Sequence, residues 1–366
     1  DSVASRGLGD VYKRQLLLLV EWLAINRYLL EGLLLIDSKT PKLRLLTRSD
    51  LEDIELEPSL VIRAVEDGYL AFAEGSSQCP TKMMIDLPVE SRDSIAFSML
   101  GFDANRDLVG YKTSYRHGSD NPDKYYTTIS LYDDESGMPY ALMDCQKVGA
   151  SRTPATTALI ARECARADAK TVTVFGTGIQ SVNTLSYLVT AVPSLEKLQL
   201  HGTHPGGLEK SRKSLNHWFP ERNIELVERD DASVMKAVQS SDITVVASGR
   251  AWHPSIQTEW IPEGGLLISV ASKGIADGAV AAADRVIATS AGQFELVGQR
   301  LLQGKEVELD ATLPDILARK APGRTNETDR VFAFSTGMII TDIPVAQELA
   351  VRAFSAGRGT EVSLWS

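Results

Sequence analysis

The stretch TVTVFGTGIQSVNTLSYLV, residues 171–189, decides the fold. A strand-like run, TVTVF, is followed by Gly176, Gly178 and Ser181, which stand at the positions of a G-x-G-x-x-[G/A/S] loop. Gly176 permits a tight turn, Gly178 lets the backbone approach a pyrophosphate, and the small Ser181 lets the next helix pack closely on the strand. The amino end of that helix would present free NH groups to the phosphates, while its apolar stripe is buried, a stripe formed by Leu185, Leu188, Val189 and Val192. The stretch predicts a dinucleotide-binding loop, although a glycine-rich turn without a dinucleotide has the same pattern.

Further short apolar runs, separated by amphipathic helices, follow this loop. Runs that are apolar on both faces are typical of a parallel sheet covered by helices on both sides. The predicted strands are residues 171–175, 197–201, 243–247, 266–271 and 285–289. We therefore predict an α/β fold in which residues 151–334 form a Rossmann-type doubly wound domain.

The flanking sequence predicts a second domain of α+β type, formed by residues 43–150 with 335–366. A helix is expected over residues 60–74, and strands over SIAFSML, LVGYKTSY and YYTTISLYD, in a largely antiparallel sheet. Pro154 is expected in the first turn of the helix that leads into the Rossmann domain. A last helix, beginning near Ile343 to Pro344, should cross back, so that the dinucleotide domain has two connections to the substrate-binding domain.

The first 36 residues differ in pattern from the rest of the sequence. The opening DSVASRGLGDVYKRQ has no initiator Met, and charged residues interrupt the apolar run after it, which argues against a signal peptide. We expect residues 1–42 to be a non-native or unstructured leader. The folded part of the chain should begin near Leu43, where LRLLTRSDLEDI predicts a short strand followed by a helix with Ser49 or Asp50 as its cap.

Composition and charge exclude several classes of protein. The formal net charge of -10 and the pI near 5.2 disfavour a nucleic-acid partner, which requires a concentrated basic surface. The three cysteines, Cys79, Cys145 and Cys164, are odd in number and widely spaced, which fits neither a disulfide framework nor a metal site. We expect a cytoplasmic protein with no metal and no membrane partner.

The end of the second predicted strand bears on the choice of dinucleotide. An Asp or Glu there would bind the ribose 2′-hydroxyl of NAD(H) and repel a 2′-phosphate. The sequence has His201, Gly202, Thr203 and His204 instead, and Lys210 or Arg212 would be available to a phosphate. NADP(H) is therefore favoured, while NAD(H) stays open.

Three segments resemble the ornithine cyclodeaminase/mu-crystallin family. ALMDCQKVGASRTPATTALIA resembles the family's MDG…RTAA…SA segment, TVTVFGTGIQS its GxGxQ loop, and FSTGMIITD its S-x-G…D segment. The resemblance extends from about Leu43 to Arg352. It implies a role in amino-acid metabolism and a homodimer whose non-cofactor domain supplies the interface, with the active site in the cleft between the two domains.

The resemblance also implies site residues. Lys82, Lys112 and Arg152 stand where the family holds the substrate carboxylate, and a desolvated carboxylate requires such partners. Taken alone, each would be read as a solvated surface residue. The glycine loop, and the rule that ligands of such sheets lie outside the carboxyl ends of the strands, give the candidate cofactor-binding residues, any of which could instead only pack or cap. They are Thr153, Gly176, Thr177, Gly178, Ile179, Gln180, Gly202, Thr203, His204, Ser248, Ala271, Ser335 and Gly337.

One departure from the family pattern concerns the mechanism. The family's cyclodeaminases use an Asp as proton shuttle just after the strand that matches LLISVAS, and this chain has Ser272, as the ketimine reductases do. Because serine is a weak base, the change removes a contribution worth ~100-fold to ~10,000-fold in rate. This favours an imine reductase or amino-acid dehydrogenase, with Lys112 as the proton source if its pKa is lowered by desolvation and a nearby cation. A cyclodeaminase and a non-catalytic NADPH-binding protein of the crystallin type stay open.

Overall fold

The computed structural model of the chain describes residues 41–88, 91–118, 124–228, 230–248, 252–270, 273–298, 301 and 307–365. Residues 44–360 form one compact unit. The described residues 41–43 and 361–365 belong to a second, small unit, in which Lys42 Nζ lies 3.4 Å from Glu361 Oε2. Residues 1–40 of the expected leader lie outside the described residues.

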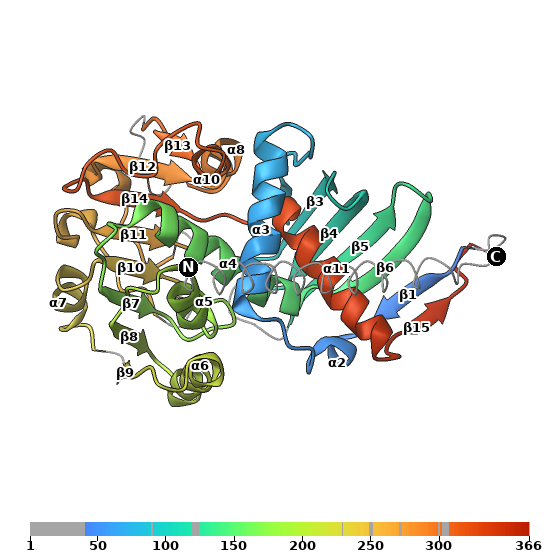
Figure 1. Ribbon diagram of the computed structural model, residues 1–366, viewed down its shortest axis with the longest axis horizontal. Coiled ribbons are helices and arrows are strands. Elements are labelled where there is room, and N and C mark those ends of the chain that lie inside the picture. The colour runs from blue at the N-terminus through green and yellow to red at the C-terminus, as the bar shows by residue number, and fades with distance from the viewer. Residues whose placement is uncertain are drawn as a thin grey trace, which may run out of the picture. The chain divides into compact units, whose positions relative to one another are not determined.

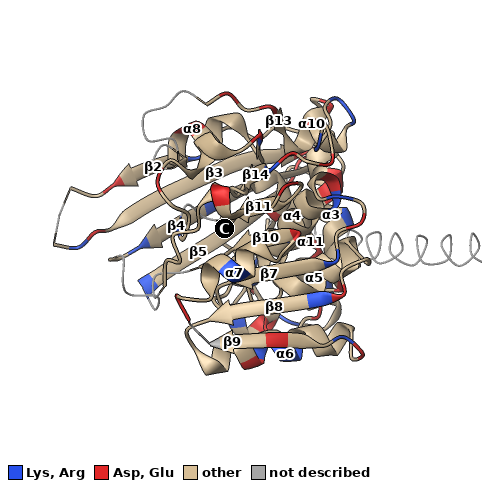
Figure 2. Cartoon of the chain, turned by 90° about the vertical axis from the view of Figure 1, so that its left-hand side faces the viewer, with Lys and Arg blue, Asp and Glu red and all other residues tan. Residues whose placement is uncertain are grey.

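The middle of the chain forms an eight-stranded sheet in which every described pair of neighbouring strands is parallel. Every residue of β10, β11, β12 and β14 is buried, as a sheet covered on both faces requires. Figure 2 shows no charged residue on β7, β10, β11 or β14. The prediction of a doubly wound α/β domain is confirmed, with all five predicted strands. In sheet order the strands are β13 (Ala311–Thr312), β12 (Arg285–Ala288), β14 (Val331–Phe334), β11 (Leu266–Ser269), β10 (Ile243–Val246), β7 (Thr171–Phe175), β8 (Lys197–Gly202) and β9 (Ile224–Glu228).

Short helices connect these strands. They are α5 (Thr184–Ala191), α6 (Pro205–Trp218), α7 (Val234–Gln239), α8 (Ala291–Val297) and α10 (Leu313–Leu317), with single 3₁₀ turns η2 (Thr258–Trp260) and η3 (Ala279–Ala282). The predicted apolar stripe of α5 is buried. However, α5 begins at Thr184 rather than directly after the glycines, because turns closed by Ser181 N and Val182 N on the Gly178 carbonyl come first.

A second sheet has the order β1 (Leu43–Leu46), β6 (Met138–Asp144), β5 (Tyr125–Asp133), β4 (Leu108–Arg116), β3 (Ile95–Asp103) and β2 (Met83–Asp86). The pair β1 and β6 is parallel and the other pairs are antiparallel, which confirms the expected α+β arrangement. The strand β15 (Thr360–Val362) is the last strand among the described residues.

Helix α11 (Ile339–Ser355) runs across one face of this sheet (Figure 1). Two glycines of the sheet allow this close approach. A Cβ at Gly101 would lie 2.6 Å from Ile339 Cγ2, and one at Gly110 would lie 2.6 Å from Ile343 Cγ1. The helices α3 (Pro58–Ala73) and α4 (Gln146–Cys164) pack against α11 and against each other, and α4 also packs against α5 and β11. Helix α4 thus joins the two sheets.

Two helices begin earlier than the positions of their prolines led us to predict. Helix α4 begins at Gln146, so Pro154 lies inside it rather than in its first turn, and α11 contains Pro344 in the same way. A proline inside a helix leaves the carbonyl four residues earlier without its N–H partner. For Pro154 that carbonyl is Ala150 O, which accepts from Asn183 Nδ2 at 3.5 Å. A side chain from later in the chain therefore satisfies the carbonyl that Pro154 leaves free.

The predicted cap of the first helix was also wrong. Thr47, not Ser49 or Asp50, caps α2 (Arg48–Leu51), and Asp50 completes a capping box by accepting from the Thr47 backbone N–H at 2.8 Å. No helix in the described part of the chain is long and apolar enough to cross a lipid bilayer.

Candidate active site

The glycine loop after β7 has the geometry of a dinucleotide cradle. Gly176 has a φ of +119°, and a Cβ there would lie 2.5 Å from the Ala247 carbonyl oxygen at the end of β10, so only glycine fits. A Cβ at Gly178 would meet no atom within 4 Å, which leaves open space beside the backbone where a pyrophosphate would lie. Ser181 is buried and its hydroxyl donates to the Gly178 carbonyl at 3.0 Å, which holds the turn closed.

The loop lies at the point where the strand order of the sheet reverses. Strand β8 lies on one side of β7, and β10 lies on the other, which is where doubly wound sheets bind ligands. Ser248 follows β10, and Ser335 is placed after β14 by a 2.8 Å bond from its N–H to the Ser269 carbonyl of β11. Ala271 and Ser272, which were predicted to lie here, are outside the described residues.

Two buried hydroxyls of the predicted cofactor set are left without a partner. Thr153 Oγ1 and Ser335 Oγ are buried, and neither has a hydrogen-bond partner among the described residues. Because buried hydroxyls are costly unless paired, both fit a site that is completed by a polar ligand. Thr153 lies inside α4, so the alternative that it caps a helix start is wrong.

Thr177 decides what can stand at the end of β8. A Cβ at Gly202 would lie 2.9 Å from Thr177 Oγ1, and a Cβ at Gly207 would lie 2.7 Å from Thr177 Cβ. The threonine therefore fills the space that an acidic side chain at position 202 would need. Thr203 and His204 are exposed at the start of α6.

Two of the three predicted carboxylate-binding residues meet at one buried acid. Lys112 on β4 and Arg152 on α4 both donate to Asp342 Oδ1 of α11, Lys112 through Nζ at 2.9 Å and Arg152 through Nε at 3.0 Å. The exposed fractions of the side chains are 6% for Lys112, 11% for Arg152 and 0% for Asp342. Neither predicted residue is the solvated surface group that the sequence alone would indicate.

The charges of this cluster stabilise one another. Burial alone would lower the pKa of Lys112, but the Asp342 carboxylate outweighs it, so the pKa of Lys112 is raised. Burial raises the pKa of Asp342, but Lys112 and Arg152 outweigh it, so that pKa is lowered. The lowered pKa expected for Lys112 is therefore wrong, because its buried carboxylate partner was not foreseen.

Lys82 has the opposite electrostatics. It is half-buried just before β2, and no ion pair of its ammonium is found within the described ranges. Burial, and then the positive charges of Arg152 and Lys112, lower the pKa of Lys82. The cluster thus contains two cations fixed by an acid and a third that loses its proton more easily.

Arg152 lies close to the predicted cofactor residues. A Cβ at Gly337, after β14, would lie 2.6 Å from Arg152 Nη2, so the guanidinium packs directly on the glycine. On the other side, Gln180 Nε2 of the glycine loop lies 3.9 Å from the Cβ position of Gly149 on α4. The helix that carries the arginine is therefore next to the loop, and the two motifs share one site.

Sequence reasoning missed three members of this site. Asp342 was quoted in a motif but given no role, although its place in the first turn of α11 is favourable for an acid. Tyr69 is fully buried on α3, its hydroxyl lies 3.3 Å from Thr156 Oγ1, and the charge of Arg152 acts on it. Cys145 is buried beside Lys112, and burial raises the pKa of its thiol to about 11. No local pattern marks the last two residues.

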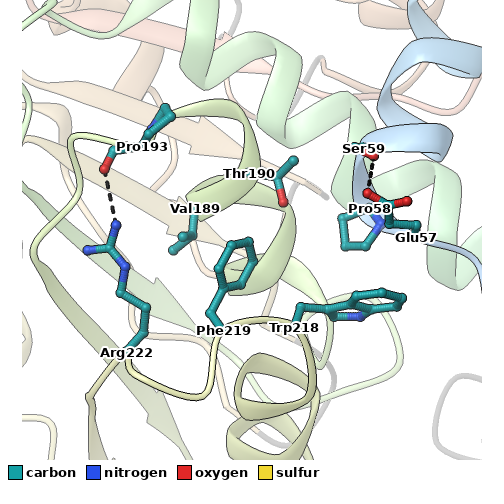
Figure 3. A pocket seen from close by; sticks show the side chains of 9 residues that line it. All are labelled: Glu57, Pro58, Ser59, Val189, Thr190, Pro193, Trp218, Phe219 and Arg222. Atoms are coloured by element: carbon teal, nitrogen blue, oxygen red, sulfur yellow. Dashed lines mark hydrogen bonds between the residues drawn. The ribbon is translucent and has the colours of Figure 1, made fainter. Parts of the chain in front are cut away.

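A surface hollow lies apart from these groups, between the start of α3, the end of α5, and the end of α6 with the residues that follow it. Figure 3 shows its lining, formed by Glu57, Pro58, Ser59, Val189, Thr190, Pro193, Trp218, Phe219 and Arg222. The guanidinium of Arg222 donates to the carbonyls of Leu195 at 2.7 Å and Pro193 at 3.2 Å. Its cation is committed to backbone groups, and we assign no function to the hollow.

Comparisons with known proteins agree with this geometry. The model of the ornithine cyclodeaminase/mu-crystallin family matches residues 44–356. An alanine dehydrogenase of Archaeoglobus fulgidus is 23% identical over 88% of this chain and 98% of its own length. The solved Δ1-pyrroline-2-carboxylate reductase of Thermococcus litoralis, in complex with NADH and L-proline, has a TM-score of 0.71 at 24% identity and covers 87% of this chain and 100% of its own. The iminosuccinate reductase of Paracoccus denitrificans, in complex with NAD+, has a TM-score of 0.73 at 19% identity and covers 88% of this chain and 100% of its own. The chain therefore belongs to the ornithine cyclodeaminase/mu-crystallin family.

Proposed function

We propose that this protein is a nicotinamide-dinucleotide-dependent oxidoreductase that reduces the C=N bond of a small α-imino acid, or catalyses the reverse oxidation of an amino acid. The observation that carries the proposal is the contact of Arg152 with Gly337, because it joins a carboxylate-binding cation to the segment expected to line the nicotinamide. The names of the relatives support the proposal, since a pyrroline-2-carboxylate reductase, an iminosuccinate reductase and an alanine dehydrogenase all act on such compounds.

The substrate carboxylate would be held by Lys82, Lys112 and Arg152. Arg152 uses Nε for Asp342, which leaves the N–H groups of its two terminal nitrogens for a ligand. Their planar, fixed geometry suits bidentate pairing with a carboxylate. Such pairing would orient the α-carbon toward the segment that contains Gly337. In this kind of reaction the main contribution of the protein is to position the substrate against the cofactor.

Reduction also needs a proton. A bound reduced dinucleotide would supply a hydride to the α-carbon. As that bond forms, the π electrons of C=N move to nitrogen, which takes a proton to give the amine. We assign this proton to Lys82, because its pKa is lowered, whereas Asp342 keeps Lys112 charged. With Ser272 in place of the cyclodeaminase Asp, net redox chemistry is favoured over ammonia release.

NADP(H) is the favoured cofactor. Thr177 packs against Gly202, so position 202 at the end of β8 has no carboxylate of its own to repel a 2′-phosphate. The cofactor would contact the glycine loop, the unpaired hydroxyls of Thr153 and Ser335, and Thr203 and His204 at the start of α6. Calorimetric dissociation constants for NADPH and NADH test this preference, and tighter binding of NADH would contradict it.

The outer face of the second sheet is proposed as the interface of a homodimer, with residues 43–150 and 335–366 as the substrate-binding and dimerisation domain and residues 151–334 as the dinucleotide domain. Large side chains on this face are exposed, 45% for Tyr111 and 48% for Leu100, and a shallow hollow there is lined by Val109, Tyr111, Ser130 and Tyr132. Large apolar side chains that are exposed together are a feature of interfaces between proteins. Light scattering should give the mass of a dimer, and a monomeric mass for the wild type would contradict the proposal.

The free thiols favour a cytoplasmic location.

The reaction is tested with a panel of substrates. Cyclic imino acids, and keto acids with ammonia, are incubated with NADPH or NADH while absorbance of the reduced nicotinamide is followed. We expect oxidation of the cofactor that requires an α-carboxylate. Conversion of ornithine to proline and ammonia without net cofactor turnover would establish a cyclodeaminase instead, and tight NADPH binding without any turnover would establish a binding protein.

A further inference from the structure

Asp342 lies behind the two cations rather than in front of them. Its side chain has no exposed surface, whereas Lys112 and Arg152 keep 6% and 11% of theirs. A ligand that enters from solvent can therefore reach the cations but not the acid.

One oxygen of Asp342 joins three separate elements. Oδ1 accepts from Lys112 on β4 and from Arg152 on α4, while Asp342 itself stands in the first turn of α11. Oδ2 is buried and has no partner in the described part of the chain, so both contacts of the carboxylate are made by Oδ1. Lysine has a flexible stem, and a fixed acceptor is what gives its ammonium one direction.

We propose that Asp342 is a positioning residue: it does not touch the substrate, but it holds Lys112 and Arg152 side by side and charged, with their remaining N–H groups directed at the bound carboxylate. This inference rests on the proposed function for the nature of the ligand, an organic carboxylate, but not for the reaction that follows.

The charged and titratable groups around the cluster determine in which direction the pKa of Lys112 moves when Asp342 is replaced. They are Tyr69 on α3, Cys79 and Lys82 before β2, Lys112 on β4, Cys145 at the start of α4, Arg152 on α4 and Asp342 on α11. Only Asp342 among them carries a negative charge at neutral pH. Without it, burial and two neighbouring cations act unopposed on Lys112, and its ammonium would lose its proton at lower pH.

The test measures binding of pyrrole-2-carboxylate, a planar analogue of a cyclic imino acid, across pH by calorimetry. A Lys82→Arg background removes the other lysine of the cluster, so that the alkaline loss of binding reports Lys112. In this background Asp342→Asn should weaken binding about 100-fold, as misplaced groups do, and should move the alkaline loss to lower pH by about one unit or more. Asp342→Glu, which restores the charge, should return the alkaline loss toward its original pH.

A structural role alone predicts something different. Asp103→Asn is the matched control, since Asp103 is also fully buried and pairs with a cation, Arg106 Nη1 at 3.0 Å, outside the site. This variant should lose stability but keep the affinity and the pH profile. If Asp342→Asn behaves in the same way, the proposal is overturned.

Two further measurements separate the possible failures. If Asp342→Asn does not fold, Lys112→Met in the same background should abolish the alkaline loss, and its persistence would refute the assignment of that loss to Lys112. The binding experiment is run with and without NADPH. Absence of reductase activity or of NADPH binding would therefore count against the proposed function, while the pH shift of anion binding would still decide the role of Asp342.

Discussion

Replacement of Gly176 by alanine should damage both folding and dinucleotide binding, and the structure allows the cost to be estimated. A non-glycine residue at a φ of +119° costs about 1–3 kcal/mol. The added Cβ would lie 2.5 Å from the Ala247 carbonyl oxygen, and relief of such overpacking costs about 1–3 kcal/mol more. The unfolding free energy should fall by about 2–6 kcal/mol, or the loop should shift. A shift that costs the bound state about 2 kcal/mol raises the Kd for NADPH about 30-fold.

Two other glycines provide matched controls. Gly137 has a φ of +67° with open space around it, so Gly137→Ala should lose about 1–2 kcal/mol of stability and bind NADPH normally. Gly178 has open space at its Cβ position and no positive φ, so Gly178→Ala should keep its stability and weaken NADPH binding. Urea denaturation gives the stabilities and calorimetry gives the Kd values. Wild-type affinity in both Gly176→Ala and Gly178→Ala would refute the assignment of the loop to the pyrophosphate.

Three other substitutions probe separate parts of the structure. Gly337→Ala places a Cβ 2.6 Å from Arg152 Nη2, so KM for an imino acid should rise about tenfold while the melting temperature is kept; an unchanged KM in steady-state kinetics would count against the site. Gly202→Asp alone should be destabilised by contact with Thr177, whereas Gly202→Asp with Thr177→Ala should fold and prefer NADH. A double variant that still prefers NADPH in binding assays would contradict the assignment of position 202 to cofactor preference. Burial lowers the pKa of His201, and its two ring nitrogens have no partner in the described part of the chain. Below about pH 6.5 the unfolded state therefore binds more protons than the folded state, and the free energy of unfolding declines as the pH falls. His201→Phe should reduce that decline below about pH 6.5 in urea titrations, and an unaltered decline would show that another group causes it.

The sequence was most informative where structure is local. The runs TVTVF and ITVVA predicted β7 and β10 nearly to the residue, because an apolar run rich in valine and isoleucine satisfies a buried parallel strand without information from elsewhere. The glycine loop was predicted for a similar reason, since Gly176, Gly178 and Ser181 lie within six consecutive residues and mark its turn by themselves.

Predictions from the sequence were wrong where a residue far along the chain changes the hydrogen bonding or the pKa of a group. Pro154 predicted a helix start. However, the side chain of Asn183 donates a hydrogen bond to the Ala150 carbonyl that the proline leaves free, and α4 continues through Pro154. Lys112 was expected to have a lowered pKa, and its direction is reversed by an acid 230 residues later in the chain. Neither partner can be identified from spacing, because only the folded chain brings them together.

The family match leaves the choice between net reduction and internal redox chemistry to experiment, and transfer of a labelled hydride tests it most directly. The protein is incubated with Δ1-pyrroline-2-carboxylate, or another imino acid that it consumes, and with NADPH deuterated at the nicotinamide C4 on the transferred face. The product is analysed by mass spectrometry. We expect one deuterium on the α-carbon of the amino acid for each NADPH oxidised. Failure to transfer deuterium to any imino acid, in protein that binds NADPH at the glycine loop, would contradict it.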